Sequence, residues 1–444
     1  MQGHRLRHLT QHGNDGRAKA RPPRADLSGP QMKASSQKWR QFRGLACTGA
    51  ALLGLPSSAL AQDDTAAPGP NPPAAQVEAS ATVQTEPVTL SGTAQAPAAP
   101  APPPSFFDVK LAIGLGVRTE FTIDPDREDP EDSPVYTLGY DLRPFISGQV
   151  NKYIKFEGNL DSNQDDDIVV QDAIIKFEFN DYANIWTGHF LPPSDRANLS
   201  GPYYQNAWNY PTGVHAYPSA FAGRDNGLAF WGQINGGQFK YQVGLFGMDA
   251  PAGTPDPRFA ARVTYNVFDP ESGYYNSSTY YGTKNILAFG AVLQYTPAPD
   301  GAPDAEADAL WNLDALWENT FGGAGTLDVE GAFYGFGGAD QGTSFFLLGS
   351  FLLEDKVGIG QFQPMLRLQR AQWNDGDTFP TAQALGAPDG IEGSLTTLDA
   401  GIHYIINGHN ARLAATLRYN SLSVADADSV NDTVITLGAQ IQAF

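Results

Sequence analysis

Cysteine is almost absent from this 444-residue sequence, in which Cys47 is the single example. It lies within a segment that we expect to be removed on export, which leaves none in the mature chain. Disulfide bonds, thiolate catalysis and cysteine-bound metals are therefore excluded. We expect neither a cofactor nor a metal to be held through sulfur.

Basic residues are also scarce. Residues 1–61 hold 10 of the 28 Lys and Arg and 2 of the 48 Asp and Glu, which leaves 18 basic and 46 acidic side chains in residues 62–444. A mature chain with a net charge of −28 repels a phosphate backbone. This balance argues against nucleic acid as a partner.

Histidine is too sparse to suggest catalysis or metal binding. The mature chain has His189, His215, His403 and His409, with no metal-ligand spacing and no GxSxG sequence. A serine that meets His403 in space remains an open alternative. We therefore predict that the protein is not an enzyme and has no catalytic, cofactor-binding or metal-binding residues.

The beginning of the sequence is typical of an exported protein. From Met32 it reads MKASSQKWRQFRGLACTGAALLGLPSSALAQ, with basic residues, an apolar run over 44–55 and the small-residue site Ala59-Leu60-Ala61. This is the pattern of a secretory signal peptide, here 32–61. We interpret 1–31 as a non-native upstream extension that results from a wrong start site. The Ala- and Pro-rich residues 62–105 are expected to form a disordered periplasmic linker.

From residue 106 onward, apolar side chains fall on every second position. The 47 Gly, 33 Pro and 11% aromatic residues also favour β structure. Period two indicates strands with one apolar and one polar face. Sixteen such segments are predicted, at 109–119, 137–149, 153–161, 169–180, 185–190, 227–234, 238–248, 259–268, 284–295, 309–318, 325–335, 343–353, 359–369, 394–405, 409–420 and 432–444.

The lengths of strands and connections favour a membrane barrel over a soluble β domain. Many segments have the nine to eleven residues that cross a bilayer at a tilt. Connections after even-numbered strands are mostly short and those after odd-numbered strands are longer, which is the outer-membrane pattern. One even connection, 269–283, breaks this rule. We predict an all-β, 16-stranded antiparallel transmembrane β-barrel over 106–444, surrounded by the lipid of a bacterial outer membrane.

The polar faces of these strands would then line a lumen. The cations assigned to the pore are Arg118, Arg143, Lys155, Lys176, Lys240, Arg262, Arg367, Arg412 and Arg418. The carboxylates assigned beside them include Glu157, Glu178 and Glu330. Opposite charges of this kind can instead pair and simply hold the wall rigid, and that alternative stays open.

The long connection 191–226 interrupts the strand pattern with a stretch dense in Pro and aromatic residues. A barrel of sixteen strands encloses a channel, so its selectivity requires something that narrows it. We expect this third loop to fold inward and form the constriction; an external cap on the mouth is the alternative. The residues assigned to the constriction are Asp195, Arg196, His215, Arg224 and Asp225.

Three stretches of the sequence resemble the phosphate-selective porin O and P family. They are WTGHFLPPSDRANLSG, AGRDNGLAFWGQINGGQFKYQVGLFGM and RVTYNVFDPESGYYNSSTYYGTKNILAFGAVLQY. The resemblance extends over about residues 106–444 and implies a 16-stranded, homotrimeric diffusion channel with an inward third loop. Family members selective for phosphate carry loop lysines, whereas residues 191–226 contain none.

Together these features predict an outer-membrane porin for passive diffusion of small hydrophilic solutes or inorganic ions, with anions such as phosphate among the candidates. The alternative is a structural or adhesin-type barrel without an open channel. Ionic conductance of the purified protein distinguishes the two.

Overall fold

The computed structural model describes residues 110–128, 134–163, 168–211, 223–247, 257–298, 307–337, 342–374, 382, 385–387, 390–425 and 427–443. The predicted upstream extension, signal peptide and linker lie outside the described residues, as does His215. In the part described, no helix is long and apolar enough to cross a bilayer.

Strands make up almost all of the described structure. Sixteen are long, and β13 has only two residues. They are β1 (Lys110–Glu128), β2 (Pro134–Gln149), β3 (Ile154–Asn163), β4 (Val169–Asn180), β5 (Ala183–Phe190), β6 (Asp225–Ile234), β7 (Phe239–Phe246), β8 (Arg258–Asn266), β9 (Ile286–Thr296), β10 (Asp308–Phe321), β11 (Gly325–Phe336), β12 (Gly342–Leu353), β13 (Lys356–Val357), β14 (Gly360–Trp373), β15 (Gly393–Asn407), β16 (Ala411–Val424) and β17 (Val430–Ala443). The helices are α1 (Arg196–Tyr204) and the 3-10 turns η1 (Asn235–Gly237) and η3 (Gly408–Asn410).

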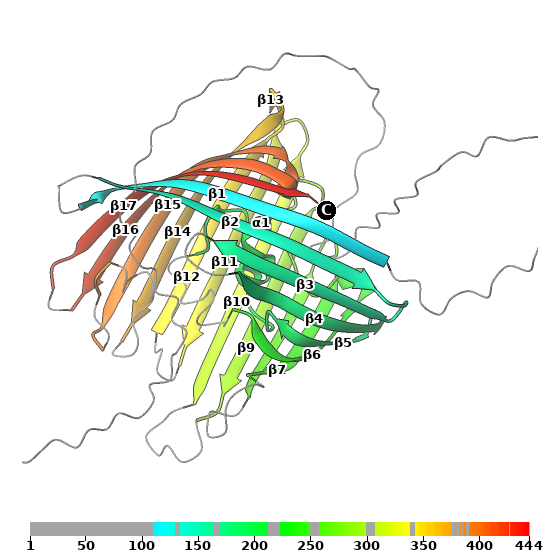
Figure 1. The fold of residues 1–444 in the computed structure, drawn as a ribbon. Coiled ribbons are helices and arrows are strands. Elements are labelled where there is room, and N and C mark those ends of the chain that lie inside the picture. Colours follow the sequence, from blue (N-terminus) through cyan, green and yellow to red (C-terminus); the bar gives the residue numbers. More distant parts are fainter. Residues whose placement is uncertain are drawn as a thin grey trace, which may run out of the picture. The chain divides into compact units, whose positions relative to one another are not determined.

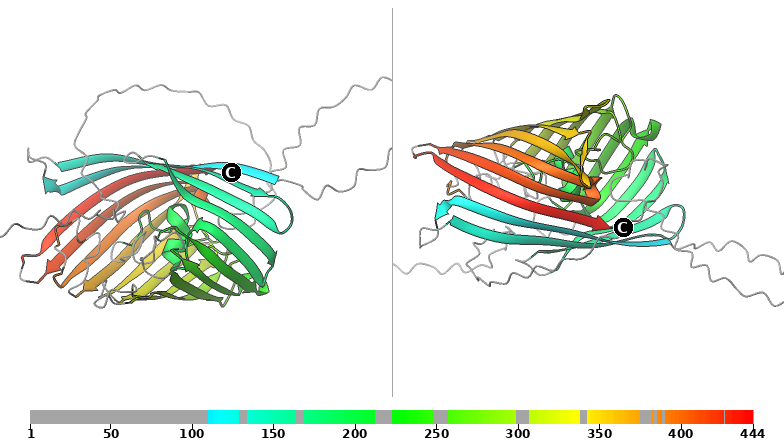
Figure 2. Two further views of the ribbon diagram at one scale, coloured as in Figure 1. Left: turned by 60° about the horizontal axis from the view of Figure 1, so that its bottom comes forward. Right: turned by 90° about the horizontal axis from the view of Figure 1, so that it is seen from above.

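The strands form one closed antiparallel sheet (Figures 1 and 2). Each long strand pairs with its neighbours in sequence, and β1 pairs with both β2 and β17. On β1, Leu115 lies opposite Pro144 on one side and Ala443 on the other. Because this closure leaves no free sheet edge, the predicted 16-stranded barrel is confirmed.

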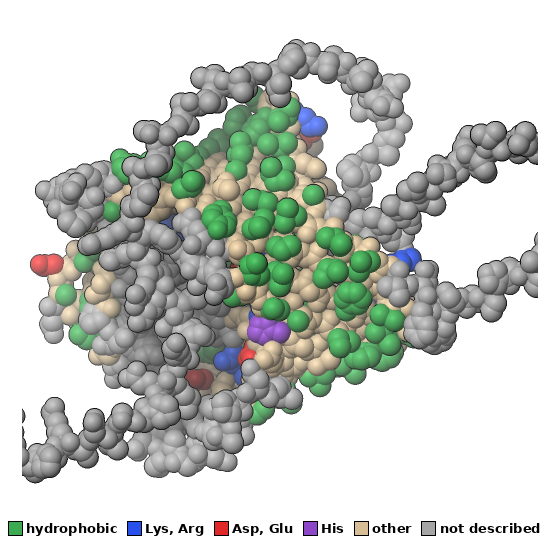
Figure 3. Space-filling model, viewed as in Figure 1, with side chains coloured by type: hydrophobic (Ala, Val, Ile, Leu, Met, Phe, Trp, Pro, Cys, Tyr) green, Lys and Arg blue, Asp and Glu red, His purple; other side chains and the backbone are tan. Residues whose placement is uncertain are grey.

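Alternation along each strand sorts side chains to the two faces. Ile113 and Leu138 are 68% and 67% exposed on the outer face, whereas the polar side chains of neighbouring positions point inward. Figure 3 shows hydrophobic side chains spread over the outer wall. The outer face is therefore apolar and the inner face polar, as the period-two pattern predicts.

The strand boundaries lie within four residues of the prediction except at the end of β1. This strand was expected to end at 119 but continues to Glu128, and β2 begins at Pro134 rather than 137. Most of the expected first connection, 120–136, is therefore strand. Phe121 and Ile123 continue the apolar alternation and pair with Leu138 and Tyr136, which extends this hairpin beyond the first expected turn.

Short turns gather at one end of the barrel, together with the beginning of β1 and the end of β17. Asparagine side chains shape two of them: Asn151 Oδ1 accepts from the Tyr153 and Ile154 N–H groups, and Asn180 Oδ1 accepts from the Tyr182 and Ala183 N–H groups. Such side-chain caps favour tight turns. The longer connections lie at the opposite end, called the long-loop end below.

Candidate functional site

The described part of the third loop, residues 191–211, lies inside the ring of strands, and its helix α1 appears there in Figure 2. Asp195 caps this helix by accepting from the Asn198 N–H, and it also accepts from the Tyr334 hydroxyl on β11. Gly201 has a φ of 63° and is followed by Pro202, so the helix bends there. The inward fold expected for this loop is confirmed.

Arginines of the wall hold the loop by its backbone. A carbonyl group inside a barrel needs a donor, and the guanidinium fork supplies several. The shortest such bond of each of four arginines is 2.6–3.1 Å long: Arg262 to Ser194 O, Arg412 to Gln205 O, Arg118 to Trp208 O and Arg367 to Asn209 O. Arg262, Arg367 and Arg412 are buried. These three cations contact the loop rather than open water, whereas Arg118 is partly exposed.

A second insertion enters the barrel from the short-turn end. It is the β8–β9 connection, residues 267–285, which the sequence marked only as unusually long. Its Glu271, Tyr274, Asn276 and Tyr280 are buried. Lys240 of β7 donates to Tyr275 O at 3.1 Å, so this wall cation also holds backbone. Chain segments therefore enter the lumen from both ends.

An ion pair joins the two insertions. Arg196 donates to both carboxylate oxygens of Glu271 at 2.7 Å, and it also donates to Ser277 O at 2.6 Å. Tyr280 donates its hydroxyl to Glu271 at 2.5 Å. Burial opposes ionisation of this carboxyl, but the adjacent Arg196 guanidinium lowers the pKa of Glu271 to about 2. Arg196 thus binds the second insertion and has 0% exposure.

His409, in the turn η3, reinforces this junction. Its Nδ1 lies 3.2 Å from Tyr203 O and its Nε2 lies 3.0 Å from Thr279 O, so the imidazole lies between the two insertions, and its neutral form donates its single N–H to one of these carbonyls. Burial, together with the nearby Arg412 charge, lowers the pKa of His409 to about 3, against the opposing effect of the two carbonyls. Ser278 N also donates to Tyr204 O at 3.1 Å. The contacts around Arg196, Glu271 and His409 are called the lumen clamp below.

Water reaches charged inner side chains mainly along β2, β3 and β4. The side chains of Lys155, Asp141 and Glu178 are 26%, 22% and 21% exposed, in contrast to 1% for both Arg196 and Glu271. Arg143, Glu157 and Arg224 are also partly accessible. We name these residues, their buried ion-pair partners Asp161, Asp172 and Lys176, and the neighbouring Arg118 the solvated strip: Arg118, Asp141, Arg143, Lys155, Glu157, Asp161, Asp172, Lys176, Glu178 and Arg224.

Most charges in the solvated strip form ion pairs within the strip. Arg143 bridges Asp141 and Asp161 at 3.0 and 3.2 Å. Three further pairs are Lys155 with Glu178 at 2.7 Å, Lys176 with Glu157, and Arg224 with Asp172 at 3.2 Å. The strip contains five carboxylates and five cations. Pairing of this kind gives a polar, nearly neutral surface.

Two aromatic residues of the loop meet this wall beside the strip. The Arg118 guanidinium lies 4.2 Å from the Trp208 ring, and that of Arg143 lies 5.7 Å from the Tyr203 ring. Glycines make room for both rings: a Cβ at Gly438 would be 2.3 Å from Trp208, and one at Gly116 would be 2.7 Å from Tyr203. The sequence reasoning did not assign these glycines.

The remaining residues assigned from sequence lie apart from the strip. Arg418 and Arg367 share Asp399 at 2.7 and 3.0 Å, and Glu330 accepts from the Ser278 hydroxyl at 3.1 Å. Asp225 accepts from the Asn226 N–H at the beginning of β6. Of the residues assigned to the constriction, Arg224 joins the strip, whereas Asp195 and Arg196 are buried against β11 and the second insertion.

Some functional residues escaped the sequence reasoning. Glu271, Tyr203 and His409 organise the junction, yet only the unexpected length of the connection 269–283 hinted at the second insertion. Within the described ranges, no cluster of three His, Cys, Asp or Glu is arranged to hold a metal.

Comparison with known proteins gives a structural likeness. No protein-family model and no curated protein matches the sequence. Solved structures do match. The anion-selective porin from Comamonas acidovorans has a TM-score of 0.50 and 13% identity, with 76% of this chain and 100% of that chain covered.

Two further structures match to a similar degree. OprB from Pseudomonas putida, in its high-pH structure, has a TM-score of 0.52 and 12% identity, with 75% of this chain and 94% of that one covered. OmpF from Salmonella typhi, in complex with daunomycin, has a TM-score of 0.50 and 10% identity, with coverage of 75% and 97%. At these identities the likeness is one of fold, a porin-like barrel.

Proposed function

We propose that the protein is an outer-membrane porin that lets small hydrophilic solutes or ions diffuse passively along the solvated strip. The observation that carries this proposal is a water-accessible, ion-paired surface inside a closed barrel with an apolar outer wall. An outer face of that kind suits a bilayer, and a polar inner face suits water. The porin-like fold is consistent with this function.

The charge balance of the strip favours broad rather than phosphate-specific passage. Five cations face five carboxylates, and three of the remaining wall arginines, Arg262, Arg367 and Arg412, donate to loop carbonyls. These contacts do not leave a dense run of basic groups that would attract a multiply charged anion. We therefore propose that, despite its resemblance to the phosphate-selective porins O and P, the protein passes a broad range of solutes rather than phosphate specifically.

Conductance in planar bilayers tests the proposal. The full-length purified protein should give stepwise ionic currents, with a reversal potential in a KCl gradient close to that of a weakly selective pore. Added phosphate should leave most of the chloride current unchanged. A large block by phosphate would instead indicate a phosphate channel.

A structural barrel is the second candidate, and one observation favours it: two insertions fill the lumen and are joined by a buried ion pair. If the insertions leave no path, the protein would stabilise the membrane or present its loops without conducting. Bilayers that stay silent over a range of salts and voltages, with correctly folded protein inserted, would establish this alternative.

Export and assembly belong to the same proposal. Cleavage after Ala61 would free a periplasmic linker, and N-terminal sequencing of the mature protein should begin at Gln62 or next to it. The exposed apolar outer face would be shared between lipid and two further copies in a homotrimer. Native mass spectrometry in detergent should then give three times the protomer mass.

A further inference from the structure

Three neighbouring strands repeat one charge pattern on the inner face of the barrel. Each carries a cation and a carboxylate two positions apart: Asp141 and Arg143 on β2, Lys155 and Glu157 on β3, and Lys176 and Glu178 on β4. On β3 and β4 the same three letters, KFE, supply the pattern. Side chains two positions apart on a strand point to the same face and lie about 7 Å apart. Each strand therefore presents both signs of charge to the lumen.

The two KFE segments are linked diagonally. Lys155 lies directly opposite Lys176 in the register of β3 with β4. Each ammonium bonds to the carboxylate of the other strand: Lys155 donates to Glu178 at 2.7 Å, and Lys176 donates to Glu157. Opposite charges therefore alternate along each strand and between diagonal neighbours. The field of such an array falls off quickly with distance, because each charge is offset by a neighbour, so a single inorganic ion gains little from it.

Trp186 on β5 holds two of these charged groups in place. Its indole N–H donates to Glu178 Oε1 at 3.1 Å, and the Lys176 ammonium lies 4.0 Å from the centre of its ring. A side chain that is already held loses little conformational freedom when a solute binds to it. The charge array is thus preorganised for contact with a solute.

Ion pairing within the array leaves capacity for further hydrogen bonds. An ammonium has three donors and a carboxylate has about four acceptor sites. Glu178 takes one donor of Lys155, and both side chains remain partly exposed. On β2, Asp141 and Arg143 are also partly exposed while they pair with each other. A passing solute can therefore bond to both members of a pair without separating them.

We propose that the solvated strip favours small zwitterions, and above all short peptides, which carry an ammonium group at one end and a carboxylate at the other. This inference rests on the proposed function, since it names the class of solute that passes along the strip. An extended dipeptide spans about 7 Å, which equals the spacing of Lys155 and Glu157. Its ammonium donates to Glu157 and its carboxylate accepts from Lys155. The antiparallel KFE segment of β4 offers the same pair to a solute in the reverse orientation.

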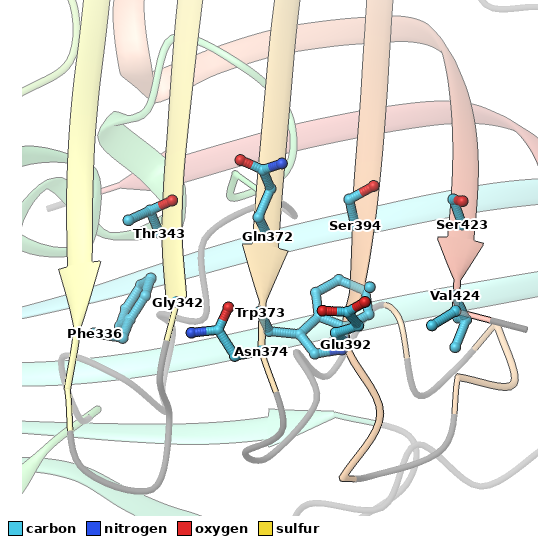
Figure 4. Close-up of a pocket in the computed structure, with 12 residues that line it drawn as sticks. Phe336, Gly342, Thr343, Gln372, Trp373, Asn374, Glu392, Ser394, Ser423 and Val424 are labelled. Carbon is cyan, nitrogen blue, oxygen red and sulfur yellow. The ribbon is translucent and has the colours of Figure 1, made fainter.

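A separate cavity at the long-loop end does not offer this chemistry. It has a volume of about 700 Å³ and lies where β12, β14, β15 and β16 meet the long connections. Figure 4 shows its polar side chains, which include Thr343, Gln372, Ser394 and Ser423, beside Trp373 and Glu392. Of its described lining residues, only Glu392 carries a charge. Recognition of both ends of a zwitterion therefore belongs to the strip.

Osmotic swelling of liposomes that contain the purified full-length protein tests the proposal. Glycylglycine is a zwitterion at pH 7, and N-acetylglycinamide is a neutral, capped analogue of similar size. Glycylglycine should enter about fivefold faster through the wild type, the gain expected from two partly exposed ionic contacts. Glycine should likewise enter faster than glycolamide, its uncharged isomer.

Two double variants test the role of one pair. Lys155→Gln combined with Glu178→Gln removes one charge of each sign, and it should lower the ratio of the glycylglycine rate to the N-acetylglycinamide rate about twofold or more. The N-acetylglycinamide rate itself should stay close to that of the wild type. Lys155→Glu combined with Glu178→Lys rebuilds the pair with reversed polarity. The ratio should then recover, because a zwitterion can turn round.

Asp355→Asn combined with Lys356→Gln is the matched control. It also removes one charge of each sign, but from exposed positions in the turn between β12 and β14 at the short-turn end. The ratio of the two rates should equal that of the wild type. A control variant that loses the preference as the strip variant does would overturn the proposal, since the preference would then not come from the strip.

Two further outcomes also overturn the proposal. One is equal entry of glycylglycine and N-acetylglycinamide through the wild type. The other is a Lys155→Gln, Glu178→Gln variant that slows both solutes by the same factor, which would mean that the pairs only hold the wall rigid. Ionic currents from the same protein keep these results apart from a failure of the proposed function: a conducting protein without the preference refutes only the solute class, whereas liposomes closed to ions and to both solutes refute the pore itself.

Discussion

Arg196 and Glu271 form a two-bond ion pair at 2.7 Å between chain segments that enter the barrel from opposite ends. The loop after β5 supplies the arginine, and the connection between β8 and β9 supplies the carboxylate. Each neutralises a charge that could not otherwise remain buried. The pair therefore fixes the two insertions to each other as well as to the wall.

Removing one member of this pair should loosen the lumen clamp. Glu271→Gln leaves Arg196 buried without its counter-charge, and breaking a buried pair costs about 3–5 kcal/mol. We expect a lower thermal midpoint and a larger or noisier single-channel conductance. Lys356→Gln, at an exposed turn, should change neither. A Glu271→Gln protein with wild-type stability and conductance would contradict the role assigned to this pair.

Selectivity should respond to the solvated strip and not to Arg196. Neutralising Arg143 or Arg224 leaves an excess of carboxylates there, so the reversal potential in a KCl gradient should move toward that of potassium. Glu178→Gln should move it the opposite way, since it leaves an excess cation. The Arg196→Ala change should have little effect on sign, because that side chain is buried.

The opposite result would contradict this assignment of the ion path. If Arg196→Ala shifts the reversal potential and Arg143→Ala does not, ions pass the helix α1 and not the strip.

Gly438 should tolerate no larger side chain. A Cβ there would lie 2.3 Å from the Trp208 ring, and overpacking of this kind costs about 1–3 kcal/mol. Gly438→Val should displace Trp208, shift its fluorescence and make the third loop easier to cleave by protease. Gly349→Ala is the control, since no atom lies within 4 Å of its added Cβ. If the protease cleaves both variants and the wild type equally, the Trp208 ring does not pack against Gly438.

Acid should weaken the lumen clamp. The folded pKa of His409 is lowered from 6.5 to about 3, so its contribution is present above pH 6.5 and is lost as pH falls toward 3. Glu271, lowered from 4.5 to about 2, loses its contribution between those values. Asp195 acts in the opposite sense: burial raises its pKa from 3.8 to about 6, so its contribution grows as pH falls through that range.

Because the effects of His409 and Asp195 oppose each other between pH 6 and 4, the steep loss of stability should come below about pH 4.5. The thermal unfolding midpoint, measured at steps from pH 7 to pH 3, reports this loss of stability. The His409→Gln variant should lose less stability than wild type over this range, and Glu271→Gln should lose less stability than wild type below pH 4.5, where only the His409 effect remains. An acid-independent midpoint for the wild type would contradict the assigned protonation states.

Alternation made the barrel predictable from the sequence, because a lipid-type face and a polar face leave a period-two pattern that hardly depends on distant contacts. The alternation of Leu111, Ile113 and Leu115 predicts β1 without any information about the strands that pair with it. Its extension to Glu128 was missed although Phe121 and Ile123 continue the apolar alternation, because the polar residues after Ile123 remain strand only through their pairing with β2. The inward third loop was predictable from its length and composition.

The roles of the inner charges could not be read from parity alone. Parity places Arg367 and Lys155 on the same inner face, yet one donates to a loop carbonyl and the other keeps a quarter of its side chain exposed. The difference depends on where the two insertions lie. Arg196 was misleading for the same reason, because its partner Glu271 is 75 residues away, in a connection that the sequence showed to be unusually long without showing where it lies.

Gln440 of β17 donates to Tyr203 O at 3.0 Å, across 237 positions of the chain. The third loop can therefore take up its final position only after β17, the last strand, has joined the sheet. Contacts so distant in sequence form late, because chain closure has to precede them. In a barrel that is still open between β1 and β17, the third loop would lack this contact and would be held loosely. The pairing of β1 with β17 and the final width of the lumen are therefore established in the same step of assembly.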